Sequence, residues 1–320
     1  MGLVEAWGGN AFGWFFAHLL EAPFNLYTAL MNTQLWLAWV PHIQLRGKIT
    51  DLDAAESLIR FIYYGASWEL LFILLFAFLV VTIIGVIRNS FMWGCVRFLE
   101  GIGNTVGRLA AWFGLLMVLQ QILIIFMQRV FAVSEITLGF GMSVTHDVSW
   151  WAEELKLYNA LIVCLCVSYT FVQGGHVRVD LVYSVVSYRA KRIIDMLGSL
   201  VFMIPAAGLT FFYGWFFLWR TLVTPKLSAS NTFKELDQLL PKARALRWNV
   251  ETIGFSPNGF NAYFLFKFLL VFFTFLVILQ AIAFFYRSYL ELREGPASEG
   301  RFLDKDALGD PTAELVAKIH

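Results

Sequence analysis

Long runs of apolar residues constrain the fold of this chain more than any other feature. About 20 residues of α-helix, rising 1.5 Å per residue, cross the roughly 30 Å hydrocarbon core of a bilayer. The sequence contains five strong runs of this kind, at about 61–87, 109–131, 155–173, 193–222 and 262–286. Only 15% of its 320 residues are charged, against about 25% in soluble domains. The sequence therefore predicts an all-α polytopic membrane protein.

Residues 11–40 form a weaker run, because polar side chains and Pro23 interrupt it. Such a segment is either one kinked span or two short helices at the membrane interface. The sequence favours the span, which predicts six crossings rather than five. In either case we expect three regions, namely an N-terminal membrane extension (1–100), a four-helix core (101–290) and a polar, mostly flexible tail (291–320).

The distribution of Lys and Arg predicts the orientation in the membrane, because cytoplasmic connections are enriched in these residues. Basic residues occur in the connections 88–108 and 174–192 and at the start of the tail, whereas the loop 132–153 has none. The long loop 223–261 has five, but long loops translocate with less regard to charge. We therefore predict that the C-terminus faces the cytoplasm.

Charge and cysteine spacing argue against two kinds of site. A formal net charge of +1 provides no basic face large enough to follow the phosphates of a nucleic acid. Cys164 and Cys166 lie two positions apart on a predicted helix, so their side chains point about 200° apart and do not converge as metal ligands. We expect no nucleic-acid partner, no metal or cofactor, and no catalytic residue.

The first polar motif, WWAEEL at 150–155, precedes the second core span. Glu153 and Glu154 are predicted in the first helical turn, where carboxylates complement the positive end of the helix dipole. Trp150 and Trp151 supply rings that favour the membrane interface. A well-anchored helix start explains this pattern, and contact of the acidic pair with a partner protein is the functional alternative.

The second motif, GGHVRVDLV at 174–182, follows the same span. Its glycines end the helix, and the residues that follow are predicted to form an amphipathic arm helix on the cytoplasmic surface. His176 and Asp180 alone lack a third metal ligand. We interpret His176, Arg178 and Asp180 as a turn, a helix cap and a contact with lipid headgroups or a partner.

Taken in order, QRVF at 128–131, WWAEEL and GGHVRVDLV resemble the small membrane subunit, or Q subunit, of the tripartite ATP-independent periplasmic (TRAP) transporters. The resemblance covers about 108–286, and the first hundred residues lie outside it. Gln128 and Arg129 shift the family's usual Arg-aromatic pair. The positions that match the family pattern are Arg129, Val130, Phe131, Trp151, Glu153, Glu154, His176, Val177, Val179 and Asp180.

This resemblance implies a subunit of a sodium-coupled importer in the bacterial inner membrane. A periplasmic solute-binding protein would deliver an organic acid, a large membrane subunit would transport it, and this chain would enlarge the fixed scaffold. Two other functions stay open on the residues alone. One is a haem- or quinone-binding membrane anchor of a respiratory oxidoreductase, which would need facing histidines within the bilayer. The other is a self-sufficient carrier.

Two charged residues are predicted inside the bilayer. Glu69 of the extra N-terminal span and Lys267 of the last span would both lie roughly 10 Å below the outer surface. An unpaired charge there costs at least ~2 kcal/mol. Either each side chain reaches the interface or the large subunit separately, or the two form an ion pair that packs the extra helix against the last one.

Overall fold

The computed structural model describes residues 3–42, 51–138, 144–173, 186–224, 245–246, 259–260 and 262–304. Five helical runs among these residues are long and apolar enough to cross a membrane. They comprise α5 (Trp68–Ile87), α6 (Asn89–Ile125) with a π-helix (Phe126–Val130), α7 (Val148–Gln173), α9 (Tyr188–Leu197) continued by a π-helix (Gly198–Met203) into α10 (Ile204–Leu222), and α12 (Phe264–Glu294). The predicted fold class, an all-α polytopic membrane protein, is confirmed.

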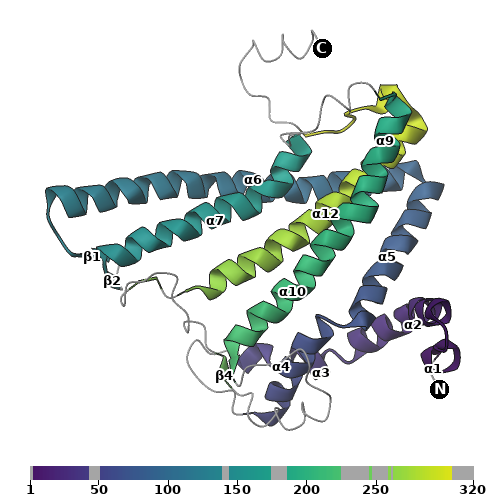
Figure 1. Cartoon of the computed structure of the whole chain (residues 1–320), viewed down its shortest axis with the longest axis horizontal. Helices are drawn as coiled ribbons and strands as arrows, with labels where there is room; N and C mark the ends of the chain where they lie inside the picture. The colour runs from purple at the N-terminus through teal and green to yellow at the C-terminus, as the bar shows by residue number, and fades with distance from the viewer. Residues whose placement is uncertain are drawn as a thin grey trace.

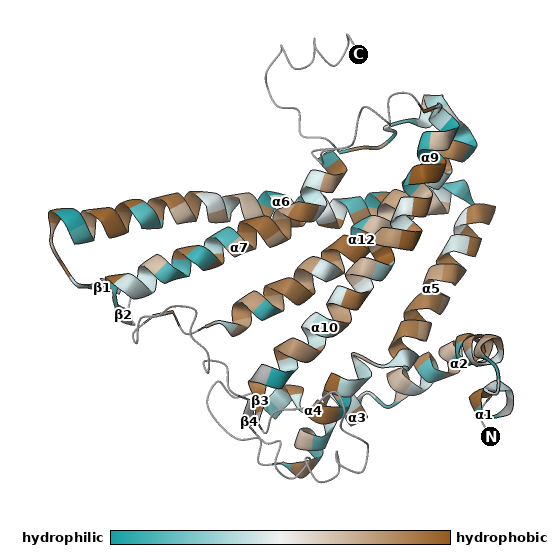
Figure 2. Cartoon of the chain, viewed as in Figure 1, coloured by the Kyte–Doolittle hydropathy of each residue, from teal (hydrophilic) through white to brown (hydrophobic). Residues whose placement is uncertain are grey.

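Helix α12 is the centre of the bundle. It contacts α6, α7, α9 and α10, and a larger share of its apolar stretch is buried than in any other span (Figure 1). Hydrophobic residues extend along α5, α10 and α12, whereas α9 is more hydrophilic (Figure 2). Because few apolar side chains of the other spans are buried, these spans present their surfaces to lipid or to another membrane protein.

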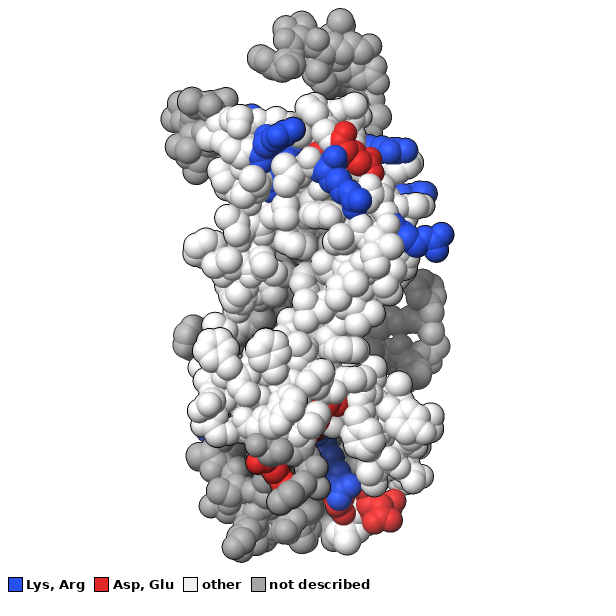
Figure 3. Space-filling view, turned by 90° about the vertical axis from the view of Figure 1, so that its right-hand side faces the viewer, with Lys and Arg blue, Asp and Glu red and all other residues white. Residues whose placement is uncertain are grey.

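The spans lie close together at one end and diverge toward the other (Figure 1). We call the first end, where α5 and α12 finish and α6 and α9 begin, the tail end. The opposite end is the hairpin end, where β1 (Glu135–Leu138) pairs antiparallel with β2 (Val144–Asp147), and β3 (Val223–Thr224) with β4 (Ala245–Leu246). On the face shown in Figure 3, charged side chains gather at both ends, with an almost uncharged band between.

The first part of the N-terminal extension, residues 3–64, lies at the hairpin end. It contains α1 (Leu3–Trp7), α2 (Ala11–Met31), α3 (Gln34–Leu37), a 3-10 turn (Val40–His42) and α4 (Leu52–Tyr64). Helix α2 packs on the first half of α5, where the His18 ring stacks on Phe72 and the Trp14 ring meets Trp68 edge-on. Helix α2 is not among the five candidate spans, so the expectation of a sixth crossing is not supported.

The predicted span 61–87 is interrupted by a turn. Helix α4 ends at Tyr64 and α5 begins at Trp68. The Ser67 hydroxyl accepts a hydrogen bond from the backbone N–H of Leu70 at 3.2 Å, which is the usual role of a serine N-cap. The span therefore starts seven residues later than the hydropathy of the run suggested, because a local cap ends one helix and begins the next.

Helix α4 packs on the hairpin end of α10. Its apolar face, including Leu58 and Ile62, forms a buried cluster with Leu218 and Trp219. The Trp215 indole N–H donates to the backbone oxygen of Ile62 at 2.9 Å. The extension is thus fastened to the core by an amphipathic helix.

Gly65 is where α4 meets the Trp215 ring, since a Cβ there would lie 2.4 Å from two ring atoms. We expect Gly65→Ala to lower the free energy of unfolding by about 1–3 kcal/mol through this overpacking. Gly94→Ala is the matched control, because nothing lies within 4 Å of a Cβ at this helical position. Thermal unfolding in detergent measures both, and equal midpoints for the two variants would contradict the contact.

Three connections differ from the sequence prediction because helices extend beyond their apolar runs. Residues 89–108 of the first connection belong to α6, and Arg189 to Arg192 belong to α9. Helix α7 begins at Val148, so Glu153 and Glu154 lie in its second turn, and the predicted first-turn dipole effect is wrong. The arm residues 174–185 lie outside the described part of the chain.

Candidate partner-contact sites

Glu153 fastens the approach to α12 onto α7 at the hairpin end. Its Oε2 accepts the backbone N–H of Phe260 at 2.8 Å, and a Cβ on Gly259 would lie 2.2 Å from the same oxygen. The Trp150 ring meets the Phe260 ring edge-on, with centroids 5.2 Å apart. A Cβ at position 259 would displace the Glu153 carboxylate, so the absence of a side chain at Gly259 leaves room for this hydrogen bond.

Glu154 joins α7 to α6. The Gln120 side-chain amide donates to Glu154 Oε2 and to the backbone oxygen of Trp151, both at 3.1 Å. The Trp151 ring packs against the buried cluster of Ile124, Ile136 and Val148. The described structure thus gives both carboxylates of the motif partners within their own chain, a role that neither sequence interpretation anticipated.

The remaining predicted site residues are not brought together with this pair. Arg129 is exposed in the π-helix that ends α6, and it makes no hydrogen bond or ion pair with the described residues. His176, Arg178 and Asp180 fall in 174–185, outside the described residues. Among the predicted contact residues that the structure describes, Arg129 is thus the one whose charge is available to a partner.

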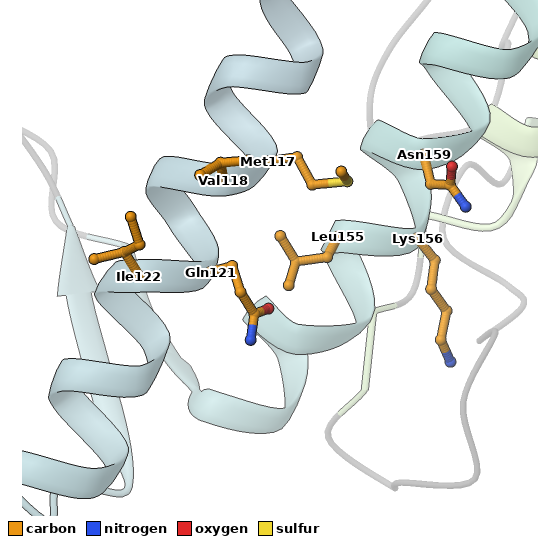
Figure 4. A pocket seen from close by; sticks show the side chains of 7 residues that line it. All are labelled: Met117, Val118, Gln121, Ile122, Leu155, Lys156 and Asn159. Carbon is orange, nitrogen blue, oxygen red and sulfur yellow. The ribbon is translucent and has the colours of Figure 1, made fainter.

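A groove of about 520 Å³ lies between α6 and α7 near the hairpin end (Figure 4). Apolar side chains line most of it, but Gln121 of α6 and Lys156 and Asn159 of α7 are polar and exposed. Polar groups within a span usually face a protein or a water-filled cavity, because hydrocarbon cannot satisfy them. The sequence motifs did not include these residues, although each is visible in the sequence as a polar position within an apolar run.

The densest set of buried charges lies at the tail end. Arg287 of α12 binds both carboxylate oxygens of Glu100 of α6, with Nε–Oε1 and Nη2–Oε2 distances of 2.6 Å. Both side chains are almost fully buried. Two parallel hydrogen bonds of this kind fix the relative position of the two helices more strictly than a single contact.

Glu291, one turn after Arg287, extends this set to α9. Arg192 Nη2 lies 3.0 Å from Glu291 Oε2 and 2.6 Å from Glu299 Oε1, and Glu291 Oε1 accepts the backbone N–H of Gly300 at 3.2 Å. These ion pairs join five side chains, which we call the tail-end charge cluster: Glu100, Arg192, Arg287, Glu291 and Glu299.

Residues 295–304, the tail strap, fold back over this cluster. The Asn104 side chain donates to the backbone oxygen of Asp304 at 2.9 Å, and Arg108 Nη2 lies 3.0 Å from the Asp304 carboxylate. The prediction of a mostly flexible tail is therefore wrong for these residues. The acidic side chains of the strap bind arginines of the spans, Glu299 binding Arg192 of α9 and Asp304 binding Arg108 of α6, whereas the basic Arg301 pairs with Glu294 of α12.

The proposed pair between Glu69 and Lys267 does not appear among the ion pairs of the described residues. Glu69 is exposed, and it lies near Tyr64, whose hydroxyl pKa is raised by burial and, second, by the Glu69 charge. Lys267 is buried, with its Nζ 4.3 Å from the Phe217 ring centroid.

Helix geometry explains why the two charges stay apart. Helix α5 meets α12 near its end, where the Thr82 and Tyr286 hydroxyls are 3.0 Å apart. At 1.5 Å per residue, Glu69 lies about 20 Å before that contact and Lys267 about 28 Å before it. The helices also diverge in this direction (Figure 1), and α10 contacts Lys267 through Phe217.

A comparison with protein-family models matched residues 139–235 to "Tripartite ATP-independent periplasmic transporters, DctQ component". The matched segment includes α7, α9 and α10 together with both polar motifs, and it is shorter than the 108–286 expected from the sequence. Searches of curated proteins and of solved structures found no match. Nothing found supports the oxidoreductase alternative. Residues 139–235 are therefore similar to the DctQ component, the small membrane component of TRAP transporters, and a long N-terminal segment precedes this match.

Proposed function

We propose that this chain is the fixed scaffold subunit of a sodium-coupled TRAP importer for an organic acid. In this proposal it holds the large transport subunit and helps to dock the periplasmic solute-binding protein. The family match over α7 to α10 carries the proposal, because the family consists of transport subunits that act in a three-component system. In this proposal the partner proteins, rather than this chain, bind the solute and sodium.

The internal contacts support a rigid rather than a moving role. Buried ion pairs tie α6, α9 and α12 at the tail end, and Glu153 and Glu154 tie α7 to its neighbours at the hairpin end. A chain fastened at both ends of its spans resists the rearrangements that a transport domain undergoes. It suits a fixed support against which another subunit moves.

The groove between α6 and α7 is the proposed contact with the large subunit. Lys156 and Asn159 are exposed within a membrane span, where contact with lipid alone would leave their polar groups poorly satisfied. A membrane helix of the large subunit that offers a carboxylate or an amide would satisfy them. Arg129 and the first part of the N-terminal extension, both at the hairpin end, would lie nearest to the docked solute-binding protein.

We further propose that the chain lies in the bacterial inner membrane with its tail end in the cytoplasm. Supporting this, Arg88, Arg97, Arg108, Arg189, Lys191, Arg192, Arg287, Arg293 and Arg301 all lie at the tail end, and cytoplasmic ends are enriched in basic residues. The hairpin end and α1 to α4 would then face the periplasm, where the solute-binding protein resides.

Reconstitution tests this function directly. We expect proteoliposomes with a sodium gradient to accumulate solute when they contain this chain, the large subunit and the loaded solute-binding protein. Omitting any one of the three should reduce uptake to background. Full uptake without this chain would refute the scaffold role, and uptake by this chain alone would identify it as a self-sufficient carrier.

A further inference from the structure

A second pocket, of about 270 Å³, lies at the tail end between the start of α6 and the tail strap. Asn89, Ser90 and Arg97 of α6 form one side, and Glu294, Arg301 and Phe302 form the other. This pocket is separate from the groove between α6 and α7, and no part of the scaffold role uses it.

Two guanidinium groups converge on one aromatic ring in this pocket. The Cζ atoms of Arg97 and Arg301 lie 5.3 and 4.8 Å from the Phe302 ring centroid. The pocket is lined by these two cations and one carboxylate, Glu294, which leaves one net positive charge. Two guanidinium groups that line one pocket attract an anion that enters it.

The Glu294 carboxylate is already engaged by other groups. One oxygen accepts from the Asn89 amide at 3.2 Å and from the Trp93 indole N–H at 3.1 Å, and the other oxygen lies 3.3 Å from Arg301 Nη1. Arg97 makes no ion pair with the described residues. Its guanidinium is therefore available to an anion from outside the chain.

The pocket lies at the level where the apolar part of the bundle ends. Helix α5 finishes at Ile87 and α12 at Glu294, which lines the pocket. Ile87, Phe91 and Phe98, which lie within two residues along the chain of the lining residues Asn89, Ser90 and Arg97, are 74%, 41% and 68% exposed. Exposed apolar side chains next to guanidinium groups match the two parts of a phospholipid, because acyl chains prefer the former and the headgroup prefers the latter.

We propose that this pocket binds the phosphate of an anionic phospholipid. Arg97 and Arg301 would donate paired hydrogen bonds to the phosphate oxygens, a geometry that suits guanidinium better than ammonium. The Ser90 hydroxyl, also in the lining, would add a donor. The acyl chains would lie along Ile87, Phe91 and Phe98, and the bound lipid would cover the joint between α5, α6 and the tail strap.

Native mass spectrometry of the full-length chain in detergent tests the site. We expect phosphatidylglycerol to be retained in preference to phosphatidylcholine, and Arg97→Gln to weaken phosphatidylglycerol binding about tenfold, since charge-assisted hydrogen bonds are the strong ones. Arg97→Lys should restore part of the binding. Arg189→Gln is the matched control, because it removes one exposed arginine at the same end but outside the pocket.

The two sources of phosphate are separated by competition. Millimolar inorganic phosphate should not displace phosphatidylglycerol if the acyl chains contribute to binding. Displacement by inorganic phosphate would identify a free-anion site and overturn the lipid assignment. Equal losses in Arg97→Gln and Arg189→Gln, or equal retention of the two lipids, would overturn the site itself. Thermal unfolding midpoints of both variants confirm that each is folded, as expected for exposed side chains.

Discussion

Arg287→Met is expected to lower the free energy of unfolding by about 3–5 kcal/mol, because it leaves the Glu100 carboxylate buried without its partner. Both oxygens of Glu100 are bound by Arg287 at 2.6 Å, and both residues are almost fully buried. Glu100→Gln should cause a loss of similar kind, since it leaves the guanidinium with one acceptor fewer.

The double variant separates pairing from general damage. In Arg287→Met combined with Glu100→Gln no buried charge of the pair is left alone, so part of the loss should be recovered, with a coupling free energy of about 1–3 kcal/mol. Arg293→Met, on the same helix but exposed, is the control and should change stability by less than about 1 kcal/mol. Strictly additive losses in thermal unfolding would show that the ion pair does not stabilise the bundle.

Apolar run length was sufficient to predict the five spans that the structure contains. The runs at 109–131, 155–173, 193–222 and 262–286 each match a helix or a continuous series of helices to within two residues at the ends of the run. Length and hydropathy decide this, because a bilayer leaves few alternatives to a helix. The ends of the helices were less predictable, since polar residues continue a helix as readily as apolar ones.

The tail-end charge cluster shows why the contacts could not be predicted. The sequence places Glu100 and Arg287 next to apolar runs, where charged residues usually face water or headgroups. Their pairing joins positions 187 apart in the sequence, and it depends on α6 and α12 both extending beyond the bilayer core. A hydropathy pattern does not show that a helix continues beyond its apolar run, and it does not identify the partner of a charged side chain. The sequence therefore predicted that Glu100 lies in the connection 88–108.

The Glu69 and Lys267 hypothesis had a different weakness. Depth was estimated separately for each residue from its own helix, but side-by-side packing requires that the helices touch at that depth. Helix α5 touches α12 at Thr82 and Phe78 instead, while Lys267 is buried against α10. Matching depth is therefore a necessary condition for a pair within a membrane but not a sufficient one.

Glu153→Ala is expected to reduce stability and uptake together, because its carboxylate holds the N–H of Phe260 at the approach to α12. A hydrogen bond to a charged acceptor contributes about 1.5–3 kcal/mol, so the midpoint of thermal unfolding should fall with the amount of folded protein in the membrane. Glu154→Ala should behave in the same way, since it removes the acceptor of the Gln120 amide.

Arg129→Ala is the contrasting variant. Its side chain is exposed and makes no ion pair with the described residues, so thermal stability should stay unchanged, whereas uptake should fall if this residue contacts a partner. The measurement is uptake per folded complex in the three-component proteoliposomes. If Glu153→Ala and Glu154→Ala lost uptake while their unfolding midpoints stayed at the wild-type value, the acidic pair would contact a partner rather than brace its own chain. The expected result is an unchanged ratio of uptake to folded protein for Glu153→Ala and Glu154→Ala and a lowered ratio for Arg129→Ala. This result would show that the acidic pair of α7 stabilises its own chain and that the end of α6 contacts a partner.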